Sequence, residues 1–67
     1  MMQLIVNGEV REVETTPTLG GFLASRDLSA KMVVVERNGE IVPRENYDKT
    51  PLANGDVLEI VQMMAGG

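Results

Sequence analysis

The amino-acid sequence predicts an α+β fold, in which a mixed sheet of four to five strands packs on one short helix. Three Asn-Gly pairs, at residues 7–8, 38–39 and 54–55, mark places where tight turns between strands are expected. Apolar and outward positions alternate beside these pairs, as they do in half-buried strands. One segment instead places its apolar residues at helical spacing, at Leu19, Phe22 and Leu23. The expected order is strand, strand, helix, strand, short strand and long final strand.

The first two strands are predicted on either side of the pair at residues 7–8. The opening strand should turn one face into the core through Met2, Leu4 and Val6. The returning segment, residues 9–14, is less regular, because Val10 and Val13 are three residues apart and cannot share one face of a regular strand. We therefore expect a bulge or an early end there.

The helix is predicted to begin after Thr18, which serves as its N-cap, with Pro17 just outside. Gly20-Gly21 lies inside it, and each glycine disfavours a helix by about 1 kcal/mol relative to alanine. We therefore expect a short helix that ends near Arg26 or Asp27 and depends on packing more than on intrinsic propensity.

The second half of the chain predicts a hairpin, a polar turn region and the final strand. Residues 32–37 and 40–42 form the hairpin, and Pro43 ends its second arm because proline lacks the amide that a central ladder needs. Residues 44–49 are polar and turn-like, with Tyr47 anchoring them to the core. Analogy with known folds, rather than the sequence pattern, suggests that the final strand, residues 56–63, lies inside the sheet beside the first strand. It should turn Leu58 and Ile60 to one side, and to the other Val57, Glu59, Val61 and Met63. This is the ubiquitin-like β-grasp layout.

Composition limits the possible functions. The chain has 67 residues, enough for one small domain, and it has neither cysteine nor histidine. It therefore lacks the thiol nucleophile and the usual general base near neutral pH. The net charge of −4 argues against nucleic acid and anionic membranes as partners and favours basic protein surfaces. Neither a signal peptide nor a bilayer-spanning segment is recognisable, so we expect a cytoplasmic protein.

The central stretch, residues 35–44, reads Val-Glu-Arg-Asn-Gly-Glu-Ile-Val-Pro-Arg and resembles the hallmark of the thiamine-biosynthesis sulfur carriers, the ThiS family. Residues 2–4 and 7–9, residues 55–56 and 58–61, and the closing Gly66-Gly67 also match that family in order and spacing. The resemblance covers essentially the whole chain. One departure is the Ala-Gly-Gly ending, where family members often have valine and three glycines. The related molybdopterin carriers also end in Ala-Gly-Gly.

The resemblance implies a β-grasp domain at residues 1–63 and a flexible C-terminal tail at residues 64–67. It implies that the carboxylate of Gly67 is adenylated and then converted to a thiocarboxylate that donates sulfur to the thiazole of thiamine. The implied partners are an ATP-dependent adenylating enzyme of the ubiquitin-activating type, thiazole synthase, and a sulfur donor such as a cysteine desulfurase. The chain itself should be a co-substrate rather than an enzyme. It should bind no cofactor or metal, with ATP used by the activating partner.

The tail suits this role physically. Gly66 and Gly67 have no Cβ, so the end of the chain can pass through a narrow channel of a partner. If it is extended, the tail reaches roughly 13–14 Å beyond the last strand. We therefore expect the tail residues Met64, Ala65 and Gly66 to enter the partner and to present Gly67.

The outward face of the sheet is the second candidate site. If the strand registers are as predicted, it carries an apolar partner surface formed by Ile5, Val34, Val61 and Met63. A register shift would instead bury one or more of these residues. Glu36, Glu59 and Asp56 would form an acidic rim that steers a basic partner.

Other polar residues have simpler interpretations. We expect Arg37 and Arg44 to form surface pairs with nearby Glu40 or Glu45, and Asp48 and Asp56 to be turn residues.

Three other functions fit the same features. The chain could deliver sulfur to molybdopterin or another cofactor, it could be a ubiquitin-like modifier joined through Gly67 to lysines, or it could be a passive β-grasp binding module. Reactivity toward thiazole synthase, isopeptide conjugates in extracts, and binding that survives loss of the two terminal glycines would distinguish these from the leading hypothesis.

Overall fold

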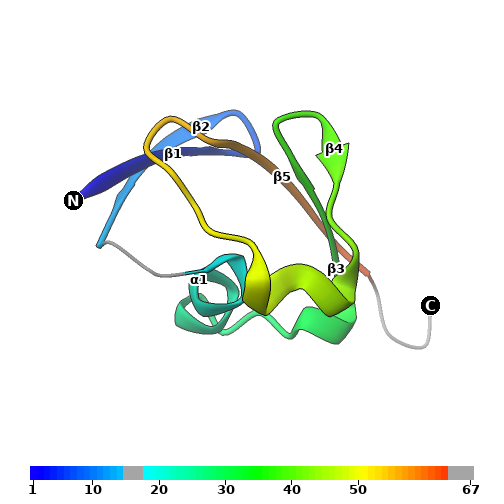
Figure 1. The fold of residues 1–67 in the computed structure, drawn as a ribbon. Helices are drawn as coiled ribbons and strands as arrows, with labels where there is room; N and C mark the ends of the chain where they lie inside the picture. The colour runs from blue at the N-terminus through cyan, green and yellow to red at the C-terminus, as the bar shows by residue number, and fades with distance from the viewer. Residues whose placement is uncertain (15–17, 64–67) are drawn as a thin grey trace.

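The computed structural model describes residues 1–14 and 18–63. Its strands are β1 (Met2–Val6), β2 (Glu9–Val13), β3 (Val33–Arg37), β4 (Glu40–Ile41) and β5 (Val57–Gln62). Its helical elements are α1 (Leu19–Ser25) and the 3-10 helices η1 (Ala30–Met32) and η2 (Arg44–Lys49). Within these two ranges, five strands form one sheet in the order β2-β1-β5-β3-β4 (Figure 1). The predicted α+β fold and the predicted order of elements are confirmed.

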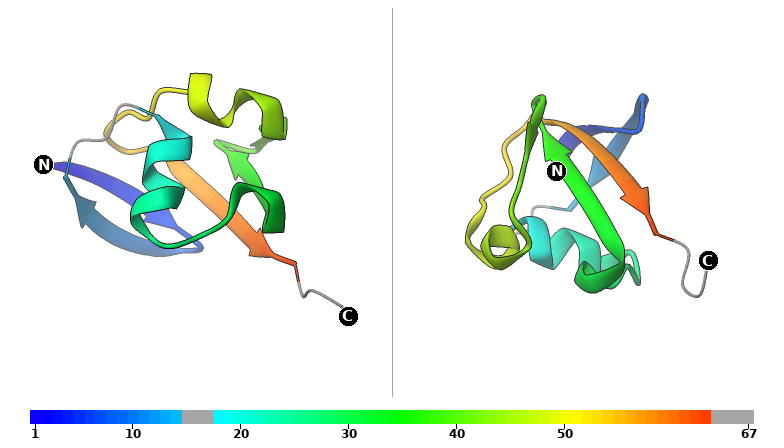
Figure 2. Two further views of the ribbon diagram at one scale, coloured as in Figure 1. Left: turned by 90° about the horizontal axis from the view of Figure 1, so that it is seen from below. Right: turned by 90° about the vertical axis from the view of Figure 1, so that its right-hand side faces the viewer.

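The sheet and the helical elements form two layers, with the core between them. In the described part of the chain, α1, η1 and η2 all lie on the same side of the sheet, and its opposite face carries no covering element (Figures 1 and 2). The core is mostly aliphatic, and its buried residues come from both layers: Met2, Leu4, Leu19, Phe22, Leu23, Val33, Val35, Tyr47 and Leu58.

The first hairpin is regular, and the predicted bulge or early end of its second strand is wrong. The register is continuous from Val6 opposite Glu9 to Met2 opposite Val13. Val10 and Val13 therefore lie on opposite faces of an ordinary strand. Val13 packs against the core, and Val10 is 64% exposed on the other face. The three-residue spacing indicated an apolar residue on the outer face, not a defect in the ladder.

Two of the three Asn-Gly pairs form mirror-image hairpin turns. Asn7 and Gly8 have φ angles of 51° and 83°, and Asn38 and Gly39 have 52° and 87°. Both central residues of such a turn need positive φ, which asparagine and glycine adopt at the lowest cost. At the third pair, only Gly55 has a positive φ, of 89°.

β5 occupies the centre of the sheet, as predicted. It is antiparallel to β3 over five residue pairs, from Val33 opposite Gln62 to Arg37 opposite Leu58. Its parallel pairing with β1 is shorter, and the side chain of Asn7 extends it. The Asn7 amide donates to the carbonyl oxygen of Ile60 at 3.1 Å and accepts from the Ile60 amide at 2.7 Å. The side chain therefore replaces the peptide group that β1 no longer supplies after its turn.

Helix α1 begins and ends as its sequence predicts. The Thr18 hydroxyl accepts from the amide of Gly21 at 3.1 Å, which confirms the N-cap. After Ser25 the chain reverses through Asp27 at a φ of 59°, and the amide of Leu28 donates to the Leu23 carbonyl at 2.9 Å. This is a Schellman ending, with aspartate in the position that glycine usually holds.

The glycine at position 20 has a packing reason. A Cβ added to Gly20 would overlap the Oδ1 atom of Asp48, because η2 lies directly against this turn of α1. The same contact brings the amide of Leu19 to the carbonyl of Thr50, at 2.8 Å. The helix therefore loses intrinsic propensity at this residue and gains close approach to η2.

Tyr47 anchors η2 to the core, as predicted. Its side chain is buried, and its hydroxyl donates to the Val33 carbonyl at 3.1 Å. No helix in the described ranges has the length and the apolar character that a bilayer crossing requires.

Candidate functional site at the end of the central strand

The central strand leads directly into the tail. Its last cross-strand bond runs from the amide of Met63 to the carbonyl of Met32, at 2.7 Å. Met63 is also the last described residue, so the predicted tail residues Met64, Ala65, Gly66 and Gly67 lie outside the described part of the chain. Their roles stay predictions. The structure establishes that the tail follows the middle strand of the sheet.

The predicted outer-face residues do lie on the face away from the helices. Val34 and Val61 are directly opposite each other, and they are 38% and 62% exposed. Met63 is 41% exposed beyond the end of β5. Ile5 is half-buried on β1. The register shift that would have buried these residues does not occur.

The outer face is larger than the four predicted residues. Strand alternation and register also place on it three exposed residues, Val10, Val57 and Ile41. Among the described residues, seven large hydrophobic side chains are exposed, and all except Met1 belong to this face. We call these six residues and Ile5 the outer apolar face. Such a concentration on one bare face is typical of a protein-binding surface, whereas scattered exposed residues are not.

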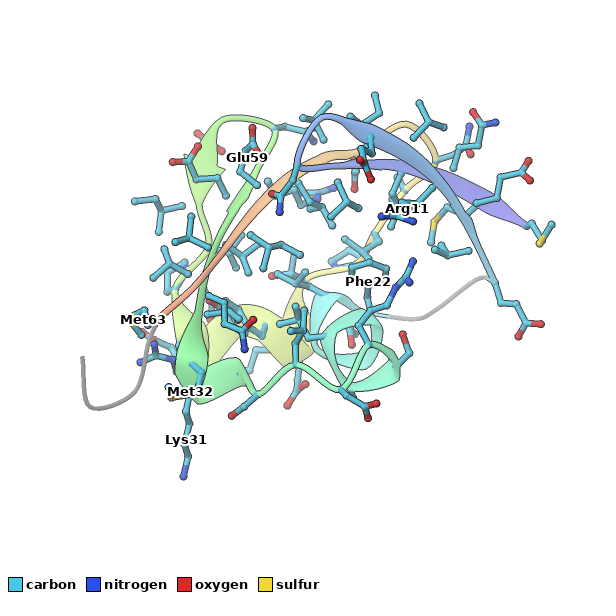
Figure 3. The ribbon with its side chains drawn as sticks, turned by 180° about the vertical axis from the view of Figure 1, so that it is seen from behind. Arg11, Phe22, Lys31, Met32, Glu59 and Met63 are labelled. Atoms are coloured by element: carbon cyan, nitrogen blue, oxygen red, sulfur yellow. The ribbon has the colours of Figure 1, made fainter. Side chains whose placement is uncertain are left out.

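Two carboxylates lie in the middle of the outer apolar face. Glu36 of β3 is directly opposite Glu59 of β5, next to the Val34 and Val61 pair. In Figure 3, Glu59 projects on the side of the sheet away from α1, and Met63 lies at the end of the same strand. The predicted acidic surface is therefore a pair within the apolar face rather than a rim around it.

Asp56, the third predicted member of the acidic rim, is instead buried at 6% exposure. Its carboxylate accepts from the amide of Ala53 at 2.8 Å, from Nε of Arg37 at 2.9 Å and from Nδ2 of Asn38 at 3.1 Å. Burial alone would raise the pKa of Asp56, but the bonds from Ala53, Asn38 and the Arg37 guanidinium outweigh it and lower the pKa below 3.8. Asp56 belongs to a turn region, as predicted. Its carboxylate links the Asn54-Gly55 turn, through Ala53, to the Asn38-Gly39 turn.

The predicted partners of the two arginines are wrong. Arg37 pairs with Asp56 rather than with Glu40 or Glu45, and Nε of Arg44 donates to the carbonyl of Ala30 at 2.8 Å. Both arginines act between segments that are distant in sequence. Glu40 and Glu45 are nearer to the arginines along the chain, but the fold brings Asp56 and the Ala30 carbonyl within hydrogen-bond distance.

A separate hollow of about 190 Å³ opens on the helix side of the sheet. It is lined by Val6, Arg11, Phe22, Arg26, Leu28 and Ile60. The guanidinium of Arg26 lies 5.4 Å from the centre of the Phe22 ring, and Arg11 pairs with Glu9 at 2.8 Å. Within residues 1–14 and 18–63, no three histidine, cysteine or carboxylate side chains gather as a metal site would require.

A mixed sheet with the last strand at its centre, covered within the described residues by helical elements on one face only (Figure 2), defines a ubiquitin-like β-grasp protein. A model of the ThiS family matches residues 4–67, and the chain belongs to this family. It is 44% identical to the sulfur carrier protein ThiS of Bacillus subtilis, over the full length of both chains. The predicted family is confirmed, and with it the function of a sulfur carrier in thiamine biosynthesis.

A solved structure and a larger relative extend this comparison. The crystal structure of the thiamine biosynthesis protein ThiS from Geobacter metallireducens has a TM-score of 0.82 and 35% identity, covering 98% of this chain and all of that one. A thiazole synthase of Paramagnetospirillum magneticum is 39% identical over 98% of this chain. The chain spans only 20% of that longer protein.

Proposed function

We propose that the sulfur is carried on the C-terminal carboxylate of Gly67. The observation that carries this proposal is that the family match, residues 4–67, includes the Gly-Gly ending. The tail follows the middle strand of the sheet, whose backbone is held on both sides by β1 and β3. A tail of four residues on a rigid base can enter a partner's active site while the domain stays outside.

The chemistry needs only the carboxylate from this chain. A terminal carboxylate has a pKa of about 3.5, so it is ionised at neutral pH and can attack the α-phosphate of ATP. Pyrophosphate leaves, and the resulting acyl-adenylate activates the carbonyl carbon of Gly67. A persulfide on a sulfur donor then displaces AMP and forms an acyl disulfide. A second thiol of the partner enzymes attacks the donor-side sulfur of this disulfide, which leaves the thiocarboxylate on Gly67 and a disulfide between the two partner sulfurs; this chain has no cysteine and cannot supply that thiol.

The partner enzymes supply the catalytic groups. We propose an ATP-dependent adenylating enzyme, a sulfur donor such as a cysteine desulfurase, and thiazole synthase as the acceptor of sulfur. One comparison supports thiazole synthase, because a protein of that name contains a segment that resembles nearly all of this chain. Two proteins that act on one substrate gain effective concentration when they are joined in one chain.

The outer apolar face is proposed to hold the adenylating enzyme while the tail reacts. It includes Val61 near the end of β5 and Met63, which immediately precedes the tail. A partner that takes Gly67 into its active site must therefore approach the end of this face. Cytoplasmic location follows from this function, because ATP and persulfide donors are used there.

The test is intact mass spectrometry of protein that is expressed without a C-terminal tag and incubated with ATP, the adenylating enzyme and a sulfur source. The expected result is a mass gain equal to the replacement of one oxygen by sulfur, localised to Gly67 and absent without ATP. A variant that lacks Gly67 is the matched control and should show no gain. Activation that survives this deletion would refute the proposal.

A further inference from the structure

The centre of the outer apolar face contains an unfavourable pairing. Glu36 and Glu59 are direct cross-strand neighbours on adjacent central strands, and both project from the outer side. Like charges in this relation destabilise a sheet, whereas opposite charges stabilise it. The chain has six lysine and arginine residues, all in the described ranges, and the structure pairs none of them with either glutamate. The free protein leaves this repulsion uncompensated.

The surroundings of the pair are apolar. Val34 and Val61 form the adjacent cross-strand pair, and Ile41 lies opposite Glu36 on the edge strand β4. A protein that covers these residues must also cover the two carboxylates and remove them from water. Burying two like charges without a counter-charge is costly, so a partner that fits this face has to bring a cation to it.

We infer that Glu36 and Glu59 together receive a cationic side chain of the adenylating enzyme, and that this contact determines which partner binds the outer apolar face. The inference rests on the proposed function, and it specifies the charge that the partner carries opposite Glu36 and Glu59. A guanidinium suits this position best, because its planar fork can donate to two carboxylates at once. Binding then replaces a repulsive pair with a charge-compensated one. An apolar surface without this cation is rejected by the same two residues.

The inference predicts opposite signs for folding and for binding. Glu36→Gln and Glu59→Gln each remove the repulsion, so the urea midpoint of the free protein should stay the same or rise. Each should weaken binding of the adenylating enzyme by about tenfold or more, because one of the two carboxylates that compensate the partner's cation becomes a neutral amide. Glu59→Lys is the sharpest variant. It creates a favourable pair with Glu36 in the free protein, and it should weaken binding more than either glutamine variant.

The experiment is titration calorimetry of the adenylating enzyme with each variant in the absence of ATP. Glu45→Gln is the matched control, since it removes the same charge from exposed η2 on the covered side of the sheet and should leave the Kd unchanged. Equal Kd values for the wild type and the Glu36 and Glu59 variants would overturn the inference, as would tighter binding by Glu59→Lys. Failure of the proposed function has a different signature, in which binding persists but deletion of Gly67 leaves activation intact.

Discussion

Replacing Asp56 with asparagine tests whether the buried carboxylate network holds the two turns together. In the wild type, one carboxylate oxygen accepts from Arg37 and from the amide of Ala53, and the other accepts from Asn38. Asparagine has nearly the same shape but only one accepting oxygen. If the asparagine oxygen accepts from Arg37 and Ala53, the new NH2 group faces the Nδ2 donor of Asn38. If the side-chain amide is rotated by half a turn, the NH2 group faces the donors of Arg37 and Ala53 instead.

The expected loss is about 2–3 kcal/mol in the free energy of unfolding. The lost bond from Asn38 contributes about 1 kcal/mol, and the unsatisfied donor that replaces it adds about 1 kcal/mol or more. The bond from Arg37 loses its charge assistance, which makes such bonds about twice as strong as neutral ones. A chain of 67 residues has a total stability of roughly 3–10 kcal/mol, so the variant loses a substantial part of it.

The assay is urea denaturation of the wild type and Asp56→Asn at a series of pH values. Because folding lowers the pKa of Asp56 below 3.8, its ionised form contributes stability that is fully present above that value. This stability is lost as the pH falls through the lowered pKa of the folded state. The difference between wild type and variant should therefore be constant near neutral pH and shrink below 3.8.

Two results would refute this reasoning. One is a loss below about 1 kcal/mol at neutral pH, which would mean that the three bonds are individually negligible. The other is a difference that does not change between neutral pH and about pH 2, which would mean that the charge of Asp56 is irrelevant. Asp48→Asn on exposed η2 is the control, because it makes the same substitution outside the Asp56 network, and its stability at neutral pH should match the wild type.

Three further changes test separate parts of the structure. Asn7→Ala removes both bonds to the backbone of Ile60 and places alanine at a φ of 51°, so urea denaturation should show a loss of about 2 kcal/mol. Gly20→Ala should change stability by no more than about 1 kcal/mol, because the gain in helix propensity is offset by the rotation that the exposed Asp48 side chain must make to clear the new Cβ. Val61→Lys should preserve the urea midpoint, because Val61 is 62% exposed, and should weaken binding of the adenylating enzyme in calorimetry at least tenfold.

Each of these changes has a control that separates the proposed cause from a general effect. Asn7→Gly keeps the turn conformation and loses only the side-chain bonds, so it should be less damaging than Asn7→Ala. The double variant Gly20→Ala with Asp48→Ala should be more stable than Gly20→Ala alone, and a double variant no better than Gly20→Ala would disprove the proposed overlap. Unchanged affinity of Val61→Lys would remove Val61 from the partner surface.

Local chemistry explains why much of the fold could be predicted from sequence. Turn residues, a helix cap and apolar periodicity act over a few neighbouring residues, and each leaves a recognisable pattern. Asn7-Gly8 and Asn38-Gly39 form the expected turns, and Thr18 caps the helix. The alternation in residues 57–63 assigned Leu58 and Ile60 to the core side and the odd-numbered residues to the outer side, as the structure has them.

Errors arose where a local pattern has two explanations that only the partner strand can separate. The spacing of Val10 and Val13 fits a bulge and also fits a regular strand with one apolar residue on each face. The pairing of β2 with β1 selects the second, which adds Val10 to the outer apolar face. The partners of Arg37 were wrong for a related reason, because Asp56 is nineteen residues away and reaches Arg37 only through the sheet.

The sequence by itself determined the family, the α+β class, the turns and the faces of the central strand, because these follow from motifs and from neighbours along the chain. Only the tertiary structure decided that Glu36 opposes Glu59, that Asp56 is buried rather than exposed, and that the exposed valines share one face of the sheet. These relations depend on the register between strands that are distant in sequence, and a shift of one residue would turn every side chain to the opposite face.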